Sequence, residues 1–220
     1  MISGRMGRTN HDDVTAALRG DILDGIYAPG ERLVELALAE RYDAGRAAIR
    51  SALVELATEG LVDREANRGA TVRQLRLDEA IQITEARSAL ESLIAAHAAR
   101  NATGDERDEL NMLELRMRDA VGREAWVEYS DLNAILHRRI REISGHEVAG
   151  DLVAMLRNRS ARHQYRLALM PGRPAESLEQ HAAIIRAIVR GDAAGASAAM
   201  AAHLLSVIDV LRHWDDDLPT

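Results

Sequence analysis

Four side chains that can bind a metal ion are spread over the second half of the 220-residue chain. Asn133 and His137 are four residues apart, so on a helix they lie about 40° apart around the axis and point to one side. His181 and His203 lie in later segments and are each followed by alanine, isoleucine or leucine. Three imidazoles and one amide oxygen that converge inside a helical domain would suit a divalent transition metal. Each histidine taken singly also fits an ordinary core or surface position, so this spacing alone does not define a metal site.

A second group of candidate residues suits the phosphates and base edges of DNA. Arg46 and Arg50 are four residues apart and share one face of a predicted helix, where long donor side chains could enter the major groove. Arg46 also lies at the start of that helix, where free backbone N–H groups favour a phosphate. Arg68 precedes Gly69 at a predicted turn, and a permissive glycine there would let the arginine reach the minor groove. The spacing is equally compatible with three solvated surface arginines.

The segment that carries these arginines has the pattern of a small helical module with a β-hairpin. Apolar residues recur at helical spacing in two stretches: Val14, Leu18 and Ile22, and then Ile49, Leu53 and Leu56. The pattern predicts three helices, of which the first ends at Gly25, the second near Tyr42 and the third at Gly60. Two strand-like segments follow at 61–65 and 70–74, joined by a short glycine-containing tip. This order of elements predicts a winged helix-turn-helix over residues 1–76.

Residues 77–220 contain long amphipathic stretches rich in Ala, Leu, Glu and Arg, with few Gly or Pro residues. Short polar or glycine-containing segments interrupt these stretches, which predicts about six helices. They are expected near 78–101, 105–121, 123–143, 147–169, 174–190 and 192–213. Because the connections are short, we expect an antiparallel all-α bundle. The predicted fold class is mainly α, with a domain boundary near residue 76.

The composition fits a soluble globular protein of two domains, with 47% hydrophobic and 29% charged residues. The chain has no cysteine, which excludes a disulfide framework and a thiolate metal site. The N-terminal MISGRMGRTN has no apolar core of signal-peptide length, and we expect no apolar run near the roughly 18 residues of a membrane span, so a cytoplasmic location without membrane contact is expected. The net charge of −7 opposes DNA binding only weakly, because residues 1–76 carry 11 arginines against 12 acidic residues, while residues 77–220 carry 17 against 23.

The first domain resembles the DNA-binding domain of the GntR family of bacterial transcription regulators. The matching residues follow the family's order: Leu18, Arg19, Ile22, Gly25, Pro29, Gly30, Leu33, Glu35, Leu38, Ala39, Arg46, Arg50, Ala52, Leu53, Leu56, Gly60, Leu61, Val62 and Gly69. The resemblance implies that Arg46 and Arg50 contact double-stranded operator DNA and that Gly69 lies at the wing tip. The chain departs from the family where Gly45 replaces the usual Ser or Thr, and two alanines follow Arg46 in place of Thr-Pro. We therefore carry over the docking geometry but not an operator sequence.

The second domain resembles the FCD ligand-binding domain of the FadR subfamily. Metal-binding members have an acidic or amide residue and a histidine one turn apart, followed by a histidine on each of two later helices. The corresponding residues here are Asn133, His137, His181 and His203, and the implied cofactor is a divalent transition metal such as zinc or nickel. Leu136 replaces a common phenylalanine, and the neutral Asn133 stands where many members have aspartate, which should weaken metal binding.

Arg87 matches an arginine that this family often directs at its effector. A guanidinium beside a metal is a good receptor for a carboxylate, which implies a small organic acid as the effector. The alternative is an exposed helix arginine that is paired with Glu91, four residues later.

Together these features predict a homodimeric transcription regulator, a repressor, that is controlled by a carboxylate-bearing effector bound near a metal. Dimerisation is expected because a two-fold symmetric protein matches a palindromic operator. One alternative is that the metal itself is the signal. Another is a metal-dependent hydrolase, but no Glu or Asp lies at adjacent helical spacing to His181 or His203 to act as a general base. We therefore predict a regulator rather than an enzyme.

Overall fold

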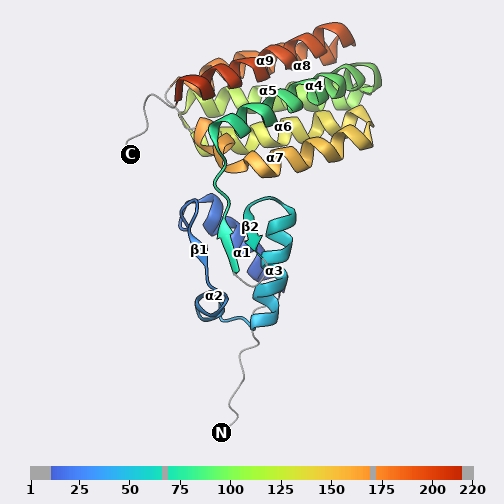
Figure 1. The fold of residues 1–220 in the computed structure, drawn as a ribbon. Helices are drawn as coiled ribbons and strands as arrows, with labels where there is room; N and C mark the ends of the chain where they lie inside the picture. The colour runs from blue at the N-terminus through green and yellow to red at the C-terminus, as the bar shows by residue number, and fades with distance from the viewer. Residues whose placement is uncertain (1–10, 66–68, 169–171, 215–220) are drawn as a thin grey trace. The chain divides into compact units, whose positions relative to one another are not determined.

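The computed structural model describes residues 11–65, 69–168 and 172–214. The chain divides into two compact units, Met1–Leu75 and Arg76–Thr220. Each unit is built around its own cluster of buried apolar residues. The elements of both units are labelled in Figure 1.

The first unit combines helices with a small sheet. The helices are α1 (His11–Leu23), α2 (Glu35–Arg41) and α3 (Arg46–Thr58), and the strands are β1 (Arg32–Leu33), β2 (Val62–Glu65) and β3 (Gly69–Val72). The strands form an antiparallel sheet in the order β1-β3-β2. Both predicted apolar stripes are buried: Val14, Leu18 and Ile22 in α1, and Ile49, Leu53 and Leu56 in α3. The predicted winged helix-turn-helix is therefore confirmed.

Strand β1 was not expected from the sequence. It consists of two residues, of which Arg32 pairs with Thr71 and Leu33 pairs with Ala70 of β3. The Leu33 side chain is 1% exposed and belongs to the core of this unit. Two residues are too few to show the alternation of apolar and polar side chains that identifies a strand.

The second unit is an all-helical bundle. Its helices are α4 (Leu77–Asn101), α5 (Gly104–Gly122), α6 (Trp126–Ser144), α7 (Glu147–Ala168), α8 (Arg173–Val189) and α9 (Ala193–Trp214). These bounds lie close to the six predicted helices, because the apolar spacing and the breaks between stretches were both clear. Where the connections are described they contain two or three residues, which folds successive helices back on one another.

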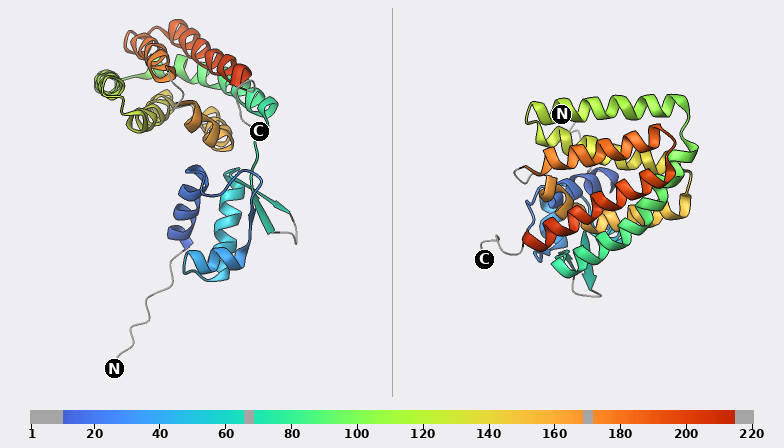
Figure 2. Two further views of the ribbon diagram at one scale, coloured as in Figure 1. Left: turned by 90° about the vertical axis from the view of Figure 1, so that its left-hand side faces the viewer. Right: turned by 90° about the horizontal axis from the view of Figure 1, so that it is seen from above.

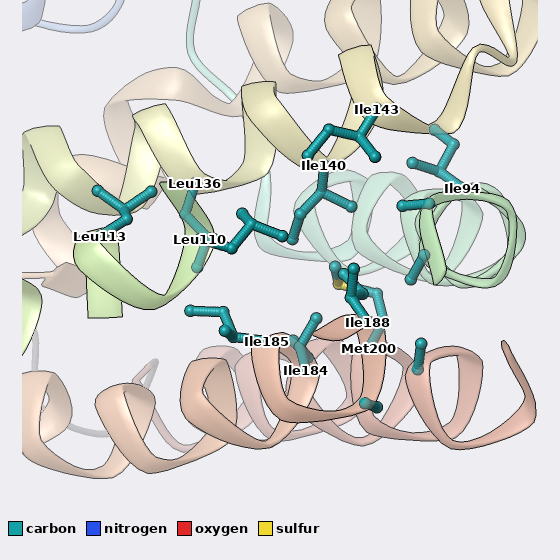
Figure 3. Packing of buried hydrophobic residues seen from close by; sticks show 14 of the residues in the cluster. Ile94, Leu110, Leu113, Leu136, Ile140, Ile143, Ile184, Ile185, Ile188 and Met200 are labelled. Carbon is teal, nitrogen blue, oxygen red and sulfur yellow. The ribbon is translucent and has the colours of Figure 1, made fainter. Parts of the chain in front are cut away.

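Helix α4 packs against four other helices of the bundle, α6, α7, α8 and α9. Figures 1 and 2 show α9 running alongside α4 over most of its length. The core between the helices is aliphatic, with Ile140 of α6, Ile184 of α8 and Met200 of α9 among the packed side chains in Figure 3. This packing gives α6, α8 and α9 fixed positions, and these three helices carry the predicted metal ligands.

Two helix ends show why the bundle turns where it does. Thr103 caps α5: its hydroxyl accepts from the Glu106 backbone N–H, and the Glu106 carboxylate accepts from the Thr103 backbone N–H. Helix α6 ends at Gly145, which has a φ of +62°. A side chain at this left-handed position would be strained, so glycine suits the helix end.

Helix α9 corrects one expectation from the sequence. Its segment Ala193–His213 is long and apolar enough to cross a membrane by length and composition, with a mean hydropathy of 1.6. The expectation that no apolar run approaches this length was therefore wrong, because an alanine-rich helix scores as apolar. A single helix of this kind is weak evidence for a membrane span, since a core helix passes the same test, and α9 buries Met200, Leu204 and Ile208 in the bundle.

Candidate functional site

Three of the predicted metal ligands come together inside the bundle. His137 of α6, His181 of α8 and His203 of α9 each offer one ring nitrogen, and these nitrogens lie within 4.8 Å of one another. All three residues are buried, at 2%, 0% and 5% exposure. Ligand nitrogens in a tetrahedral zinc site are about 3.4 Å apart, as follows from Zn–N distances near 2.1 Å. Small side-chain movements would therefore bring these imidazoles to coordinating distance.

Each of these histidines has a polar partner at Nδ1. His137 Nδ1 lies 2.7 Å from a Glu91 carboxylate oxygen, and His203 Nδ1 lies 2.9 Å from the Gln180 amide oxygen. His181 Nδ1 lies 3.2 Å from the Tyr129 hydroxyl. Because Nδ1 is engaged in every case, Nε2 is the nitrogen that remains for a metal.

An unpartnered buried nitrogen supports this assignment. His181 Nε2 is buried and has no hydrogen-bond partner within the part of the chain that the structure describes. Asn133 Oδ1 is likewise buried without such a partner in the described ranges, and Asn133 lines the same cavity as His137 and His203. Buried polar atoms are rarely left unpaired in folded proteins. The donor set of three imidazoles and one amide oxygen fits a divalent transition metal.

The protonation states of the three histidines also favour metal binding. Burial lowers the pKa of all three imidazoles, and neighbouring histidines lower the pKa of His181 and His203 further. For His137 the nearby Glu91 carboxylate opposes this effect without reversing it. Neutral imidazoles are therefore present at pH 7, and a neutral imidazole is the form that binds a metal.

A small cavity adjoins the histidines. Its volume is about 50 Å³, and its lining includes three arginines, Arg87, Arg157 and Arg173. The side chains of Arg87 and Arg173 are 4% and 7% exposed, and that of Arg157 is 15% exposed. Buried guanidinium groups around a polar cavity favour an anion of few atoms.

Glu91 joins the arginines to the histidines. Its carboxylate accepts from Arg87 at 2.8 Å and lies 3.9 Å from Arg157, in addition to its contact with His137. Burial alone would raise the pKa of Glu91, but Arg87, His137 and Arg157 outweigh it and hold this pKa well below the ordinary range. Burial, together with the positive charge of Arg87, lowers the pKa of Arg157 to about 9. Glu91 and Arg157 are therefore both charged at pH 7.

Arg87 forms the ion pair with Glu91 that the alternative named, but the prediction of an exposed arginine was wrong, because the pair is buried. Arg87 also lines the cavity, and its contact with an effector stays a prediction. Glu91 was missed as a site residue, since only the fold brings it to His137, which is 46 residues away in the chain. Tyr129 was missed although a signal existed: it lies one helical turn before Asn133, on the face that also carries His137.

The candidate DNA contacts lie at the start of α3. Arg46 and Arg50 are 65% and 60% exposed and lie along the edge of the buried stripe of that helix. Both lie near the Glu35 carboxylate, at 3.9 and 3.1 Å respectively. Gly45 is the N-cap and provides no side-chain bond, so the first turn of α3 keeps free N–H groups.

The structure describes only part of the wing. Gly69 opens β3 with a φ of +91°, in the left-handed region that favours glycine. Arg68 lies outside the described residues. The predicted contact of Arg68 with DNA therefore remains a prediction.

A winged helix-turn-helix joined in one chain to an all-helical domain defines a class of two-domain transcription regulators. Residues 10–72 match the model for bacterial regulatory proteins of the gntR family, and residues 82–206 match the FCD domain. The chain belongs to the GntR family and carries an FCD domain.

Similar proteins agree with this assignment. The chain is 26% identical over 195 residues to the HTH-type transcriptional repressor RspR of Escherichia coli, covering 89% of this chain and 86% of RspR. It is 31% identical over 208 residues to an uncharacterized HTH-type transcriptional regulator in an unstable DNA locus of Streptomyces ambofaciens, covering 92% and 85% of the two chains. The solved structure of E. coli McbR/YncC has the same fold, with a TM-score of 0.78 at 21% identity and coverage of 97% and 99%. The protein is thus a DNA-binding transcription regulator, and the hydrolase alternative is set aside.

Proposed function

We propose that this regulator is a repressor whose FCD domain binds a divalent metal, zinc or nickel, together with a small carboxylate. The observation that carries the proposal is the unpartnered Nε2 of His181, which lies in a histidine cluster beside a cavity lined by arginines. Asn133, His137, His181 and His203 would hold the metal. When bound, the metal would supply a positive charge and open coordination positions for a carboxylate oxygen.

The chain's own residues would complete the anion site. Arg87 and Arg157 line the cavity next to His137, and Arg157 is charged at neutral pH. A carboxylate held there would neutralise buried positive charge and accept hydrogen bonds from guanidinium groups. Binding would change DNA affinity only through unequal affinity of the effector for two arrangements of the regulator.

The DNA-binding role is proposed for Arg46, Arg50, Arg68 and Gly69. The exposed arginines at the start of α3 suit the major groove, and the wing suits the neighbouring minor groove. A homodimer is proposed because two reading heads match a two-fold symmetric operator. The name of the relative RspR supports repression, and a cytoplasmic location follows from the proposed contact with operator DNA.

Metal binding is tested by elemental analysis and by calorimetric titration of chelator-treated protein with zinc. We expect about one equivalent of zinc per chain for the wild type and its loss when His181→Ala and His203→Ala are combined. His213→Ala is the matched control, because His213 lies on the same helix as His203 but is exposed. Equal zinc binding by the double variant and the control would contradict the proposal.

DNA binding is tested by fluorescence anisotropy with the DNA upstream of the regulator's own gene, at several salt concentrations. Arg46→Ala and Arg50→Ala should each weaken binding about 10-fold and lower the salt slope by about 1, as expected for a lost phosphate contact. Arg212→Ala removes an exposed arginine from the other unit and serves as the control. If Arg46→Ala and Arg50→Ala behave like Arg212→Ala, these arginines do not read DNA.

The second candidate is that the metal alone is the signal. This candidate is favoured because the three histidines are themselves buried in the core between α6, α8 and α9. In that case DNA affinity would follow the free zinc concentration with no organic acid present. A response to zinc that needs an added carboxylate would instead support the two-ligand proposal.

A further inference from the structure

Tyr129 has a buried hydroxyl that lies between the histidine cluster and the cavity. It is 1% exposed, lies on α6 one turn before Asn133, and lines the same cavity as Arg87 and Arg157. Its Oη lies 3.2 Å from His181 Nδ1. Burial raises the pKa of Tyr129 to about 12, so the hydroxyl keeps its proton at neutral pH.

The direction of the bond between Tyr129 and His181 depends on the other ring nitrogen of the histidine. A neutral imidazole carries one proton. When that proton is on Nε2, Nδ1 accepts a hydrogen bond from the Tyr129 hydroxyl. When Nε2 gives its lone pair to a metal, the proton must be on Nδ1, and Nδ1–H then donates to Tyr129 Oη. In this second state the hydroxyl proton of Tyr129 is released for a different acceptor.

Two hydroxyl groups, those of Tyr129 and Ser177, lie close enough to His181 Nδ1 to accept its N–H. Ser177 Oγ lies 3.4 Å from the same nitrogen, against 3.2 Å for Tyr129, and both side chains line the cavity. Tyr129 lies closer to the single Nδ1–H, and Ser177 also forms a hydrogen bond with the Tyr129 hydroxyl. The cavity beside Tyr129 is lined in part by three guanidinium groups, so an anionic oxygen is an acceptor that fits there.

We propose that Tyr129 is an anion-binding residue whose hydroxyl donates into the cavity only when Nε2 of His181 is ligated. This inference rests on the proposed function, because it needs both a metal at the histidines and a carboxylate in the cavity. It makes Tyr129 the link by which occupancy of the metal site strengthens carboxylate binding. A hydrogen bond to a charged acceptor is worth more than one between neutral groups, so the effect is measurable.

The test uses the full chain loaded with cobalt(II), whose visible spectrum reports changes in coordination, and acetate as the probe anion. We expect Tyr129→Phe to weaken acetate binding to the cobalt-saturated protein at least fivefold. Tyr42→Phe is the matched control, because it removes a tyrosine hydroxyl that is bonded to Asp21 in the first unit. This control should leave both cobalt affinity and acetate binding within twofold of the wild type.

The outcomes separate the inference from the proposed function. A wild type that binds no cobalt, or whose cobalt spectrum ignores acetate, contradicts the proposed function and with it the inference. If the wild type responds and Tyr129→Phe binds acetate equally well, only the inference is overturned. A larger loss in Ser177→Ala than in Tyr129→Phe also overturns it, because the donating hydroxyl would then belong to Ser177.

Discussion

Replacing Glu91 by glutamine tests whether the buried charge network holds the FCD domain together. The carboxylate is 2% exposed, accepts from Nε and Nη2 of Arg87 at 2.8 Å, and lies 2.7 Å from His137. Glutamine keeps the shape and removes the charge. Its NH₂ group must then face either Arg87, where a donor meets a donor, or His137 Nδ1, which accepts only if the imidazole proton moves to Nε2, and in both cases the charge of Arg87 loses its buried counterion. Removing one partner of a buried ion pair costs about 3–5 kcal/mol, and we expect a loss of this size in the free energy of unfolding.

A surface pair of the same chemistry provides the control. Glu114 and Arg118 of α5 are also four residues apart and 2.8 Å from each other, but Arg118 is 38% exposed. Glu114→Gln should therefore cost at most about 1 kcal/mol. Both variants are measured as chelator-treated protein by urea unfolding, followed by circular dichroism. If Glu91→Gln costs no more than Glu114→Gln, the buried network does not stabilise the fold as argued.

The pH dependence gives an independent check on Glu91. Its pKa in the folded state is held well below the ordinary 4.5, despite the opposing effect of burial, by Arg87, His137 and Arg157. A carboxyl with a lowered pKa stabilises the fold above the ordinary value and loses this contribution as the pH falls below it. The difference in stability between wild type and Glu91→Gln should therefore narrow below about pH 4.5, where Glu91 takes up a proton in the unfolded chain. A gap that keeps widening below that pH would refute the assignment.

Three further predictions concern the bundle and its histidines. Metal-free protein should lose stability as the pH falls below 6.5. Burial holds the pKa of His181 and His203 lower in the folded state, so the unfolded chain binds protons first. Melting temperatures from pH 8 to 5.5 measure this loss, and melting temperatures that do not change with pH would contradict it. Thr103→Ala removes the cap of α5 and should cost about 1 kcal/mol in urea unfolding, whereas Thr103→Ser should cost much less. Gly145→Ala places a side chain at a φ of +62° and should cost about 1 kcal/mol; a stabilising effect would show that the strain is absent.

The fold could be predicted from the sequence because its signals are local. Apolar residues at helical spacing identified every helix of the bundle to within a few residues, and the glycine and proline positions identified the breaks. Strand β1 escaped prediction because it exists only through pairing with β3, which a two-residue segment cannot encode by its own pattern. Local patterns thus predict elements, while pairing partners come from the tertiary structure.

The site was less predictable because its supporting contacts join distant segments. The sequence identified His137, His181 and His203 as ligating residue types, and the fold brings them together. Their polar partners were not foreseen, since Glu91 and His137 are 46 residues apart and Tyr129 and His181 are 52 apart. Such contacts depend on how each helix is rotated about its own axis within the bundle. The apolar periodicity identifies the buried face of a helix, but it does not determine which residue of that face meets a given partner.

The contacts of Glu91 also change what kind of effector recognition Arg87 can provide. The Nε and Nη2 groups of Arg87 are both directed at Glu91, which takes up two of the five N–H donors of the guanidinium. Only the edge formed by Nη1 and Nη2 is then left for an anion. Glu91 lies within 4 Å of both Arg87 and Arg157, so one carboxylate faces two guanidinium groups and a positive charge is left over. A carboxylate in the cavity would balance that charge, so it would be held by several cations and by the Tyr129 hydroxyl rather than by Arg87 alone.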